Sequence, residues 1–103
     1  MAKVIEVDGE LVLQLSLREK IFAFHGNPRA KASDLISTTE MENPWRKEVL
    51  RGMRAPGTAI PYIVLLGTMR FKGGKDFTAI YKRGAVRIYE FQAGEFKRWI
   101  VSL

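Results

Sequence analysis

Closely spaced turn signals divide this chain into short apolar runs, and their spacing constrains the fold more than any other feature. Asp-Gly suits the positive φ angles of a two-residue hairpin turn, and clusters of Gly, Pro and Asn interrupt strands and helices. Many short strands joined by tight turns, with little helix, are typical of a small β-barrel or sandwich. The turn signals are Asp8-Gly9, Gly26-Asn27-Pro28, Lys72-Gly73-Gly74-Lys75 and Lys82-Arg83-Gly84.

The individual strands follow from the runs between these turns. Residues 4–7 and 10–17 predict a hairpin, because leucines alternate with other residues along the second run. Trp45 and Val49 lie four apart, on one face of the only convincing helical stretch, residues 45–50. Residues 95–103 fit a short helix or a strand, and we prefer a turn followed by a strand. Further strands are expected at residues 20–25, 29–32, 37–41, 62–71, 77–81 and 85–91.

The composition is that of one folded domain. The chain has 103 residues, of which 47% are hydrophobic and 27% are charged, close to globular averages. No repeat or linker divides it, so we treat residues 1–103 as a single domain. The acidic residues near the N-terminus are unlike a signal peptide, and the most apolar run, residues 60–69, is about half the ~20 residues of a membrane-spanning helix. We therefore expect a cytoplasmic protein.

The positive charge is concentrated in the second half of the chain. Residues 1–43 hold five basic and seven acidic side chains, whereas residues 44–103 hold twelve basic and four acidic ones. The net charges of the two parts are therefore −2 and +8, which add to the +6 of the whole chain. The basic half is a candidate anion-binding region. Alternatively, its lysines and arginines keep strand edges soluble and prevent edge pairing.

An unusual run between residues 51 and 61 predicts a shaped basic loop that is neither helix nor strand. The Pro-Gly pair within it suits a type II turn, since proline fixes φ at one central position and glycine allows a positive φ at the next. Such a loop would hold two arginines beside backbone N–H groups that face an anion. In a purely structural interpretation, the same arginines hydrogen-bond exposed carbonyls. The run reads Arg51-Gly52-Met53-Arg54-Ala55-Pro56-Gly57-Thr58-Ala59-Ile60-Pro61.

Several loop motifs along nearly the whole chain resemble those of a family of small, uncharacterised bacterial proteins with a Pleckstrin-homology-like (PH-like) split barrel. The resemblance implies a barrel of about seven short antiparallel strands in two bent sheets, with no assigned activity. PH-like barrels usually close one end with a C-terminal helix. Here residues 95–103 either close that end of the barrel or leave it open to a ligand or to a second copy of the chain. The motifs are His25-Gly26, Asn43-Pro44-Trp45, residues 51–61, Gly67-Thr68 and Gly73-Gly74-Lys75-Asp76-Phe77.

No set of residues assembles for catalysis. The chain has no cysteine, and its only histidine, His25, precedes Gly26 and is expected to be structural. The closely spaced carboxylate pairs are better explained as solvated strand edges, because acid–base catalysis needs one desolvated carboxyl group. No metal-ligand spacing is present, so we expect neither a metal nor a cofactor, and not an enzyme. The carboxylate pairs are Glu6 with Asp8 and Glu40 with Glu42.

We therefore predict a non-enzymatic binding or interaction module whose ligand is unknown. Its partner is expected to be an unidentified protein or another acidic molecule. The chain could also form a homo-oligomer. The alternative is binding to nucleic acid or to an anionic membrane surface through the basic half, where aromatic and basic residues interleave. The candidate ligand-binding residues are Arg51, Arg54, Arg70, Lys72 and Lys75. The residues expected to shape the loops are Gly52, Pro56, Gly57, Gly73 and Gly74.

Overall fold

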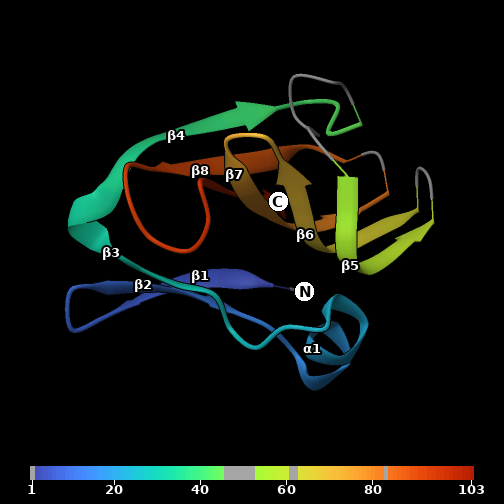
Figure 1. Cartoon of the computed structure of the whole chain (residues 1–103), viewed down its shortest axis with the longest axis horizontal. Coiled ribbons are helices and arrows are strands. Elements are labelled where there is room, and N and C mark those ends of the chain that lie inside the picture. The colour runs from blue at the N-terminus through green and yellow to red at the C-terminus, as the bar shows by residue number, and fades with distance from the viewer. Residues whose placement is uncertain (1, 46–52, 61–62, 83) are drawn as a thin grey trace.

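Two β-sheets and one short α-helix make up the part of the chain that the structure describes. The structure is a computed structural model, and it describes residues 2–45, 53–60, 63–82 and 84–103. A three-stranded sheet has the order β1-β2-β3, and a six-stranded sheet has the order β4-β8-β9-β7-β6-β5 (Figure 1). The mainly β class predicted from the sequence is confirmed. The elements are β1 (Lys3–Val7), β2 (Glu10–Gln14), α1 (Leu17–Ala23), β3 (Arg29–Lys31), the 3-10 turn η1 (Ala32–Asp34), β4 (Leu35–Met41), β5 (Met53–Ile60), β6 (Val64–Phe71), β7 (Gly74–Tyr81), β8 (Val86–Phe91) and β9 (Arg98–Ser102).

The first predicted hairpin is confirmed, although its second strand is shorter than expected. Asp8 and Gly9 have φ angles of 52° and 77°, which suit a tight turn between the antiparallel strands β1 and β2. β2 ends at Gln14 rather than at residue 17. It pairs on its other side with the short strand β3, which confirms the strand expected near residues 29–32.

The strand predicted at residues 20–25 is wrong, because this segment belongs mainly to α1. Ser16 and Glu19 form a capping box at the start of the helix: the Glu19 backbone N–H donates to Ser16 Oγ at 3.2 Å, and the Ser16 backbone N–H donates to Glu19 Oε1 at 2.8 Å. Phe24 ends the helix in a left-handed conformation with φ of 55°. The Ser-x-x-Glu spacing is therefore the sequence signal that the strand prediction overlooked.

The predicted shaped loop is also corrected, because residues 53–60 form the edge strand β5. β5 pairs antiparallel with β6, and its register shifts between Arg54 and Gly57. This irregularity accommodates Pro56, because an edge strand tolerates a residue that lacks an N–H group. The described residues do not include Arg51, Gly52 or almost all of the helix expected at residues 45–50. They also do not include the side chains of Arg54 and Pro56.

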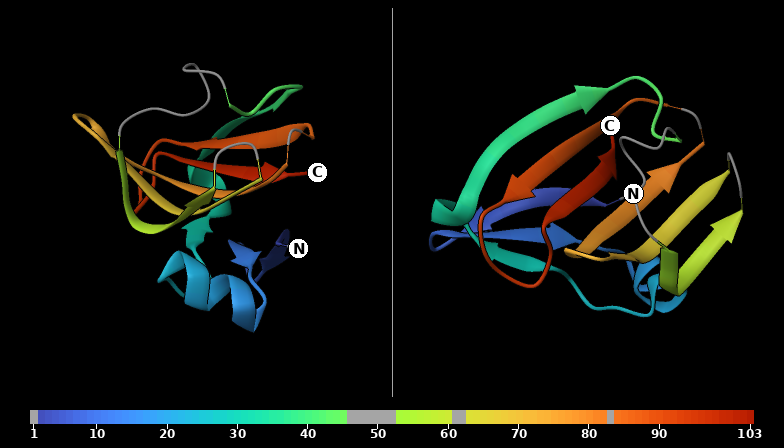
Figure 2. Two further views of the ribbon diagram at one scale, coloured as in Figure 1. Left: turned by 90° about the vertical axis from the view of Figure 1, so that its right-hand side faces the viewer. Right: turned by 45° about the horizontal axis from the view of Figure 1, so that its top comes forward.

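One of the two central strands of the large sheet, β9, comes from the last residues of the chain. β9 lies between β7 and β8, parallel to the first and antiparallel to the second (Figure 2). Residues 95–103 therefore contain a strand, as preferred from the sequence. The parallel β7–β9 pair departs from an all-antiparallel barrel, and the described residues contain nine strands rather than about seven.

Both faces of the large sheet carry apolar side chains. One cluster fills the space between the two sheets and includes the fully buried Leu13 and Phe77, with Trp99. A second cluster lies on the opposite face of the large sheet around Ile80, Val86 and Ile100, with Met41 and Trp45 packed against it. The Trp45 indole N–H donates to the Lys82 carbonyl at 2.8 Å. The strong curvature of the large sheet is visible in Figure 2.

Gly57 should be intolerant of substitution, because a Cβ atom there would lie 2.3 Å from the Leu66 carbonyl oxygen and φ is +153°. Gly57→Ala is expected to lower the free energy of unfolding by about 1–3 kcal/mol, measured by urea denaturation. Gly84→Ala is the matched control, since nothing lies within 4 Å of its Cβ position. Equal stability of the two variants would contradict the close contact between β5 and β6.

Candidate binding surface

The helix α1 exposes apolar side chains and buries a charged one. Leu17, Ile21 and Phe24 are 75%, 59% and 68% exposed, whereas Glu19 is only 3% exposed. Leu17 and Ile21 lie four apart on one face of α1, and Phe24 is the residue that ends the helix. We call these three exposed residues the α1 stripe. An ordinary surface helix has the opposite arrangement, with its apolar face toward the core. The reversal makes the α1 stripe the leading candidate for a binding surface.

Hydrogen bonds explain why Glu19 faces inward. The Tyr81 hydroxyl of β7 donates to Glu19 Oε2 at 2.5 Å, and the Ser16 backbone N–H donates to Oε1. Burial alone raises the pKa of Glu19, but the hydrogen bonds from Ser16 and Tyr81 outweigh it, so this pKa lies below its ordinary value. Burial first, and then the hydrogen bond to Glu19 and its charge, raise the pKa of Tyr81. The pair fixes α1 to β7 with its apolar stripe outward.

A second contact holds the other end of α1 against the large sheet. The Thr58 hydroxyl of β5 donates to the Phe22 carbonyl at 2.7 Å. α1 accordingly lies beside β5 and β6, outside the space between the two sheets (Figure 1). With Glu19 attached to β7 and Phe22 attached to β5, the helix has two independent anchors.

An apolar cavity of about 260 Å³ opens between α1 and strands β5 to β7. Ile60, the last residue of β5, is half exposed, lines this cavity and extends the apolar surface beyond the helix. We call the α1 stripe together with Phe22 and Ile60 the α1 surface. The cavity is lined by Arg18, Phe22, Thr58, Ile60, Val64, Leu66 and Tyr81.

The charged side chains that α1 presents to solvent are cationic. Arg18 and Lys20 flank the α1 stripe, and neither side chain forms a hydrogen bond or an ion pair with the described residues. Glu19 is the only acidic residue of the helix, and its carboxylate already accepts from Ser16 and Tyr81. The helix therefore presents an apolar surface with positive charge beside it, which suits a partner that carries negative charge.

The structure brings three of the predicted binding residues to one end of the large sheet. Arg70 and Lys75 face each other across the β6–β7 pair, and Lys72 is exposed in the turn between them with Gly73. Gly74 begins β7, and its φ of +152° fits a glycine. Arg54 pairs in register with Met69, so its backbone lies at the same end. Lys97, which the sequence analysis did not single out, packs its side chain beside Gly74.

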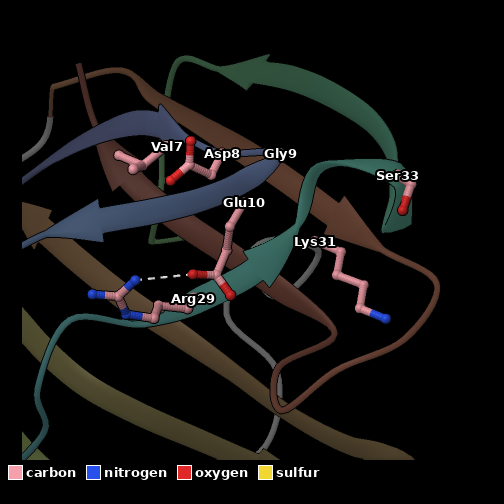
Figure 3. A pocket seen from close by; sticks show the side chains of 7 residues that line it. All are labelled: Val7, Asp8, Gly9, Glu10, Arg29, Lys31 and Ser33. Carbon is pink, nitrogen blue, oxygen red and sulfur yellow. Dashed lines mark hydrogen bonds and ion pairs between the residues drawn. The ribbon is translucent and has the colours of Figure 1, made fainter.

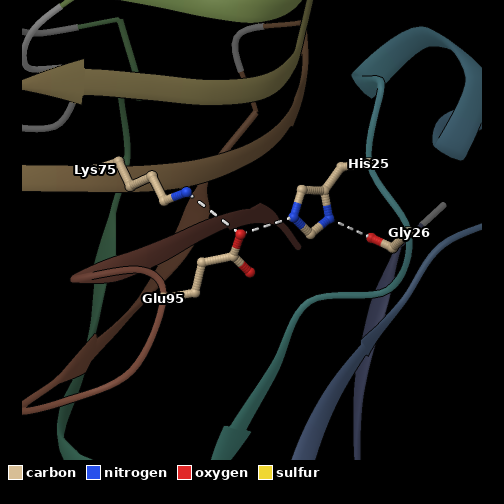
Figure 4. A network of polar contacts seen from close by, with 4 residues as sticks. All are labelled: His25, Gly26, Lys75 and Glu95. Carbon is tan, nitrogen blue, oxygen red and sulfur yellow. Dashed lines mark hydrogen bonds and ion pairs between the residues drawn. The ribbon is translucent and has the colours of Figure 1, made fainter.

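Lys75 is engaged within the protein rather than being free to bind a ligand. Lys75 Nζ lies 3.3 Å from Glu95 Oε2, and His25 Nε2 lies 3.3 Å from the same oxygen (Figure 4). Burial raises the pKa of Glu95, but the hydrogen bonds from His25 and Lys75 bring it below its ordinary value. The His25 ring also packs against Phe77 and Phe96, with centroids 5.4 Å and 5.3 Å away. These contacts agree with the structural role expected for His25.

A second hollow, near the β1–β2 turn, is polar and of mixed charge. It is lined on one side by the ion pair between Arg29 and Glu10, whose nitrogen and oxygen atoms are 2.9 Å apart (Figure 3). Cations and carboxylates alternate around it, so its charge favours neither an anion nor a cation. The lining residues are Val7, Asp8, Gly9, Glu10, Arg29, Lys31 and Ser33.

The remaining chemistry of the described residues adds no further site. Within them, no group of three His, Asp or Glu side chains is placed to hold a metal ion. No helix in the same ranges has the length and apolar character needed to cross a membrane. Comparison of the chain with family models, curated proteins and solved structures finds no match.

Glu19 should contribute stability that depends on pH. Its folded-state pKa lies below the ordinary 4.5, so the contribution is present above that pH and is lost as the pH falls through the lowered value. Glu19→Gln is expected to cost about 1–3 kcal/mol at pH 7, because the bonds from Ser16 and Tyr81 lose their charged acceptor. Urea denaturation should show this difference shrinking below about pH 4.5.

Glu6→Gln is the matched control for this measurement, since Glu6 lies on the exposed part of β1. Its unfolding free energy should follow the unaltered protein within about 0.5 kcal/mol at every pH. A pH-independent difference between Glu19→Gln and the unaltered protein would show that the Glu19 carboxylate is not preferentially stabilised in the fold.

Proposed function

We propose that this protein is a cytoplasmic, non-enzymatic binding module that holds an acidic partner protein on the α1 surface. The observation that carries the proposal is the outward α1 stripe of Leu17, Ile21 and Phe24. Removing a Leu, Ile or Phe side chain from water contributes about 1.5–3 kcal/mol, so three neighbouring side chains can dominate the affinity of an interface. Arg18 and Lys20 beside the stripe favour a partner with carboxylates.

The anchors of α1 support a binding role. Because Tyr81 holds Glu19 and Thr58 holds the Phe22 carbonyl, the helix is in place before a partner arrives. A preorganised surface loses little conformational entropy on association. The adjacent edge strand β5 is less suited to a partner, since Pro56 and the irregular register at Gly57 interrupt the edge that another strand would need. The α1 surface is therefore preferred over strand addition.

The basic residues predicted from the sequence keep a supporting part in this proposal. Alternation along β6 and β7 places Arg70 and Lys75 on the same face of the large sheet as Leu66 and Tyr81. An acidic partner that extends beyond the α1 surface would meet Arg70 and the exposed Lys72 there. Arg54, whose backbone lies at this end, remains a candidate, as does Arg51, which is outside the described residues. The resemblance to the PH-like family also stays a prediction.

An anionic membrane surface is the second candidate. A helix with an apolar stripe and flanking cations is typical of segments that lie in the membrane interface. Nucleic-acid binding through the basic half of the chain has less support, because stacking needs exposed aromatic faces in that half. Phe77 is fully buried between the sheets, and Tyr81 packs at the cavity with its hydroxyl bound to Glu19.

The double variant Leu17→Ser/Ile21→Ser tests the proposed interaction. A variant with a photo-crosslinking residue in place of Phe24, and no other change, should yield a defined complex with one acidic protein. The affinity of the double variant for that purified protein should be at least 100-fold lower than the affinity of the unaltered protein. This estimate follows from about 3–6 kcal/mol for two buried side chains. Ile36→Ser is the matched control, because Ile36 is 58% exposed on β4, away from α1. Its affinity should be unchanged.

Vesicles separate the two candidates. Sedimentation with vesicles containing 30 mol% phosphatidylserine should show no binding under the leading proposal, at about 50 mM or 300 mM salt. If the protein binds vesicles, and this binding weakens with salt and is lost in Leu17→Ser/Ile21→Ser, the membrane surface is the ligand in place of a partner protein. Retention of the protein partner by that double variant would contradict the proposed role of the α1 stripe.

A further inference from the structure

We propose that the cavity between α1 and strands β5 to β7 is a binding site for a medium-chain carboxylate, with its alkyl chain in the cavity and its carboxylate on Arg18. The site shares Arg18, Phe22 and Ile60 with the proposed protein-binding surface, but the inference does not require that the α1 stripe binds a protein. It rests on the lining of the cavity, its size, and the presence of one cationic residue, Arg18, among the residues that line it.

The cavity wall is apolar because its polar groups are satisfied elsewhere. Leu66 and Val64 of β6 lie at the wall, with Phe22 and Ile60 on either side. Two lining residues carry hydroxyl groups, but the Tyr81 hydroxyl donates to Glu19 and the Thr58 hydroxyl donates to the Phe22 carbonyl. Since both hydroxyl protons are already used, the cavity offers little to water, and an alkyl chain is its best-matched occupant.

The same two hydrogen bonds preform the site. One joins the first turn of α1 to β7, and the other joins its last turn to β5, so the helix is fixed across the cavity at both ends. A ligand therefore need not order the wall that it contacts. Most small-molecule sites are preformed in this way, with mainly apolar walls and a few polar groups that orient the ligand.

Arg18 supplies the orienting polar group. Its side chain lines the cavity, is exposed, and forms no hydrogen bond or ion pair with the described residues. Because the wall is apolar, it is the hydrocarbon part of Arg18 that lines it, which leaves the guanidinium outside the wall. The neighbouring carboxylate of Glu19 points inward to Tyr81 and Ser16, so it is not available to pair with Arg18. A guanidinium group binds a carboxylate through two parallel hydrogen bonds. An apolar wall with this cation at its rim fits a molecule with an alkyl chain and an anionic head.

The cavity volume limits the length of the chain. Its 260 Å³ is smaller than the about 300–1,000 Å³ of sites for drug-sized molecules. A water-sized group takes about 30 Å³, so the space holds roughly eight such groups, with the carboxylate outside at Arg18. A single chain of about eight carbons therefore fits, whereas a two-chain lipid does not.

Titration with sodium octanoate tests the proposal. We expect saturable shifts of the Leu66, Val64 and Thr58 methyl signals in NMR spectra of the full chain. Octylammonium, which has the same chain and the opposite charge, should bind at least tenfold more weakly. Arg18→Gln should weaken octanoate binding about tenfold, the equivalent of ~1.4 kcal/mol, and should leave binding of neutral octan-1-ol unchanged.

A variant that fills the cavity provides the second measurement. Ile60→Trp should abolish the octanoate shifts, because the larger ring occupies space beside Val64. Ile36→Trp is its matched control, since Ile36 is exposed to a similar degree at a distance from the cavity. Urea denaturation of both variants verifies folding, and if Ile60→Trp does not fold, Arg18→Gln alone decides the test.

Three results would overturn the proposal: no saturable octanoate shifts, equal binding of octanoate and octylammonium, or octanoate affinity that Arg18→Gln does not change. Tighter binding of the tripeptide acetyl-Gly-Gly-Phe than of octanoate would assign the cavity to a peptide carboxyl end instead. Leu17→Ser/Ile21→Ser separates this inference from the proposed function, because that variant should lose the protein partner and still bind octanoate.

Discussion

The hydrogen bond from Tyr81 to Glu19 determines what the molecule presents to its surroundings. Glu19 is nearly inaccessible to solvent, and its carboxylate accepts from the Tyr81 hydroxyl and from the Ser16 backbone. A helix of seven residues is too short to be stable alone, so tertiary contacts must set its orientation. Because the inward face of α1 consists of Glu19, held by this bond, and the small Ala23, the larger apolar side chains of the helix are left on the outside.

Maintaining this arrangement has a physical cost in stability. A buried carboxylate is favourable only while every partner is present, and an apolar stripe in water gives up the free energy that its burial would contribute. The other contacts of α1 do not require the stripe to face outward. Placing Arg18 next to the apolar cavity adds a third feature that stability alone does not explain. The proposed binding role accounts for all three features together.

Local sequence signals predicted much of the sheet but little of the candidate site. The Asp8-Gly9 hairpin and the final strand followed from turn chemistry and apolar alternation. The strand prediction over α1 is wrong because the Ile21-Phe22 pair is typical of a strand, whereas the capping residues Ser16 and Glu19 begin a helix. The loop prediction over β5 is wrong because proline and glycine usually interrupt strands, although an edge strand permits both. The Tyr81–Glu19 contact joins residues 62 positions apart, so no local pattern predicts it.

The position of β9 has a consequence for the order in which the sheet can form. β9 alone joins β8 to β7, so without it the large sheet consists of two separate parts, β4-β8 and β5-β6-β7. Of the strands described, β9 is the last to leave a ribosome, and its parallel partner β7 precedes it by about twenty residues. The buried pair of Arg98 and Asp76, 2.8 Å apart across that junction, can form only then. Until β9 enters between them, β7 and β8 each have an open edge, and the two parts of the large sheet lack this connection.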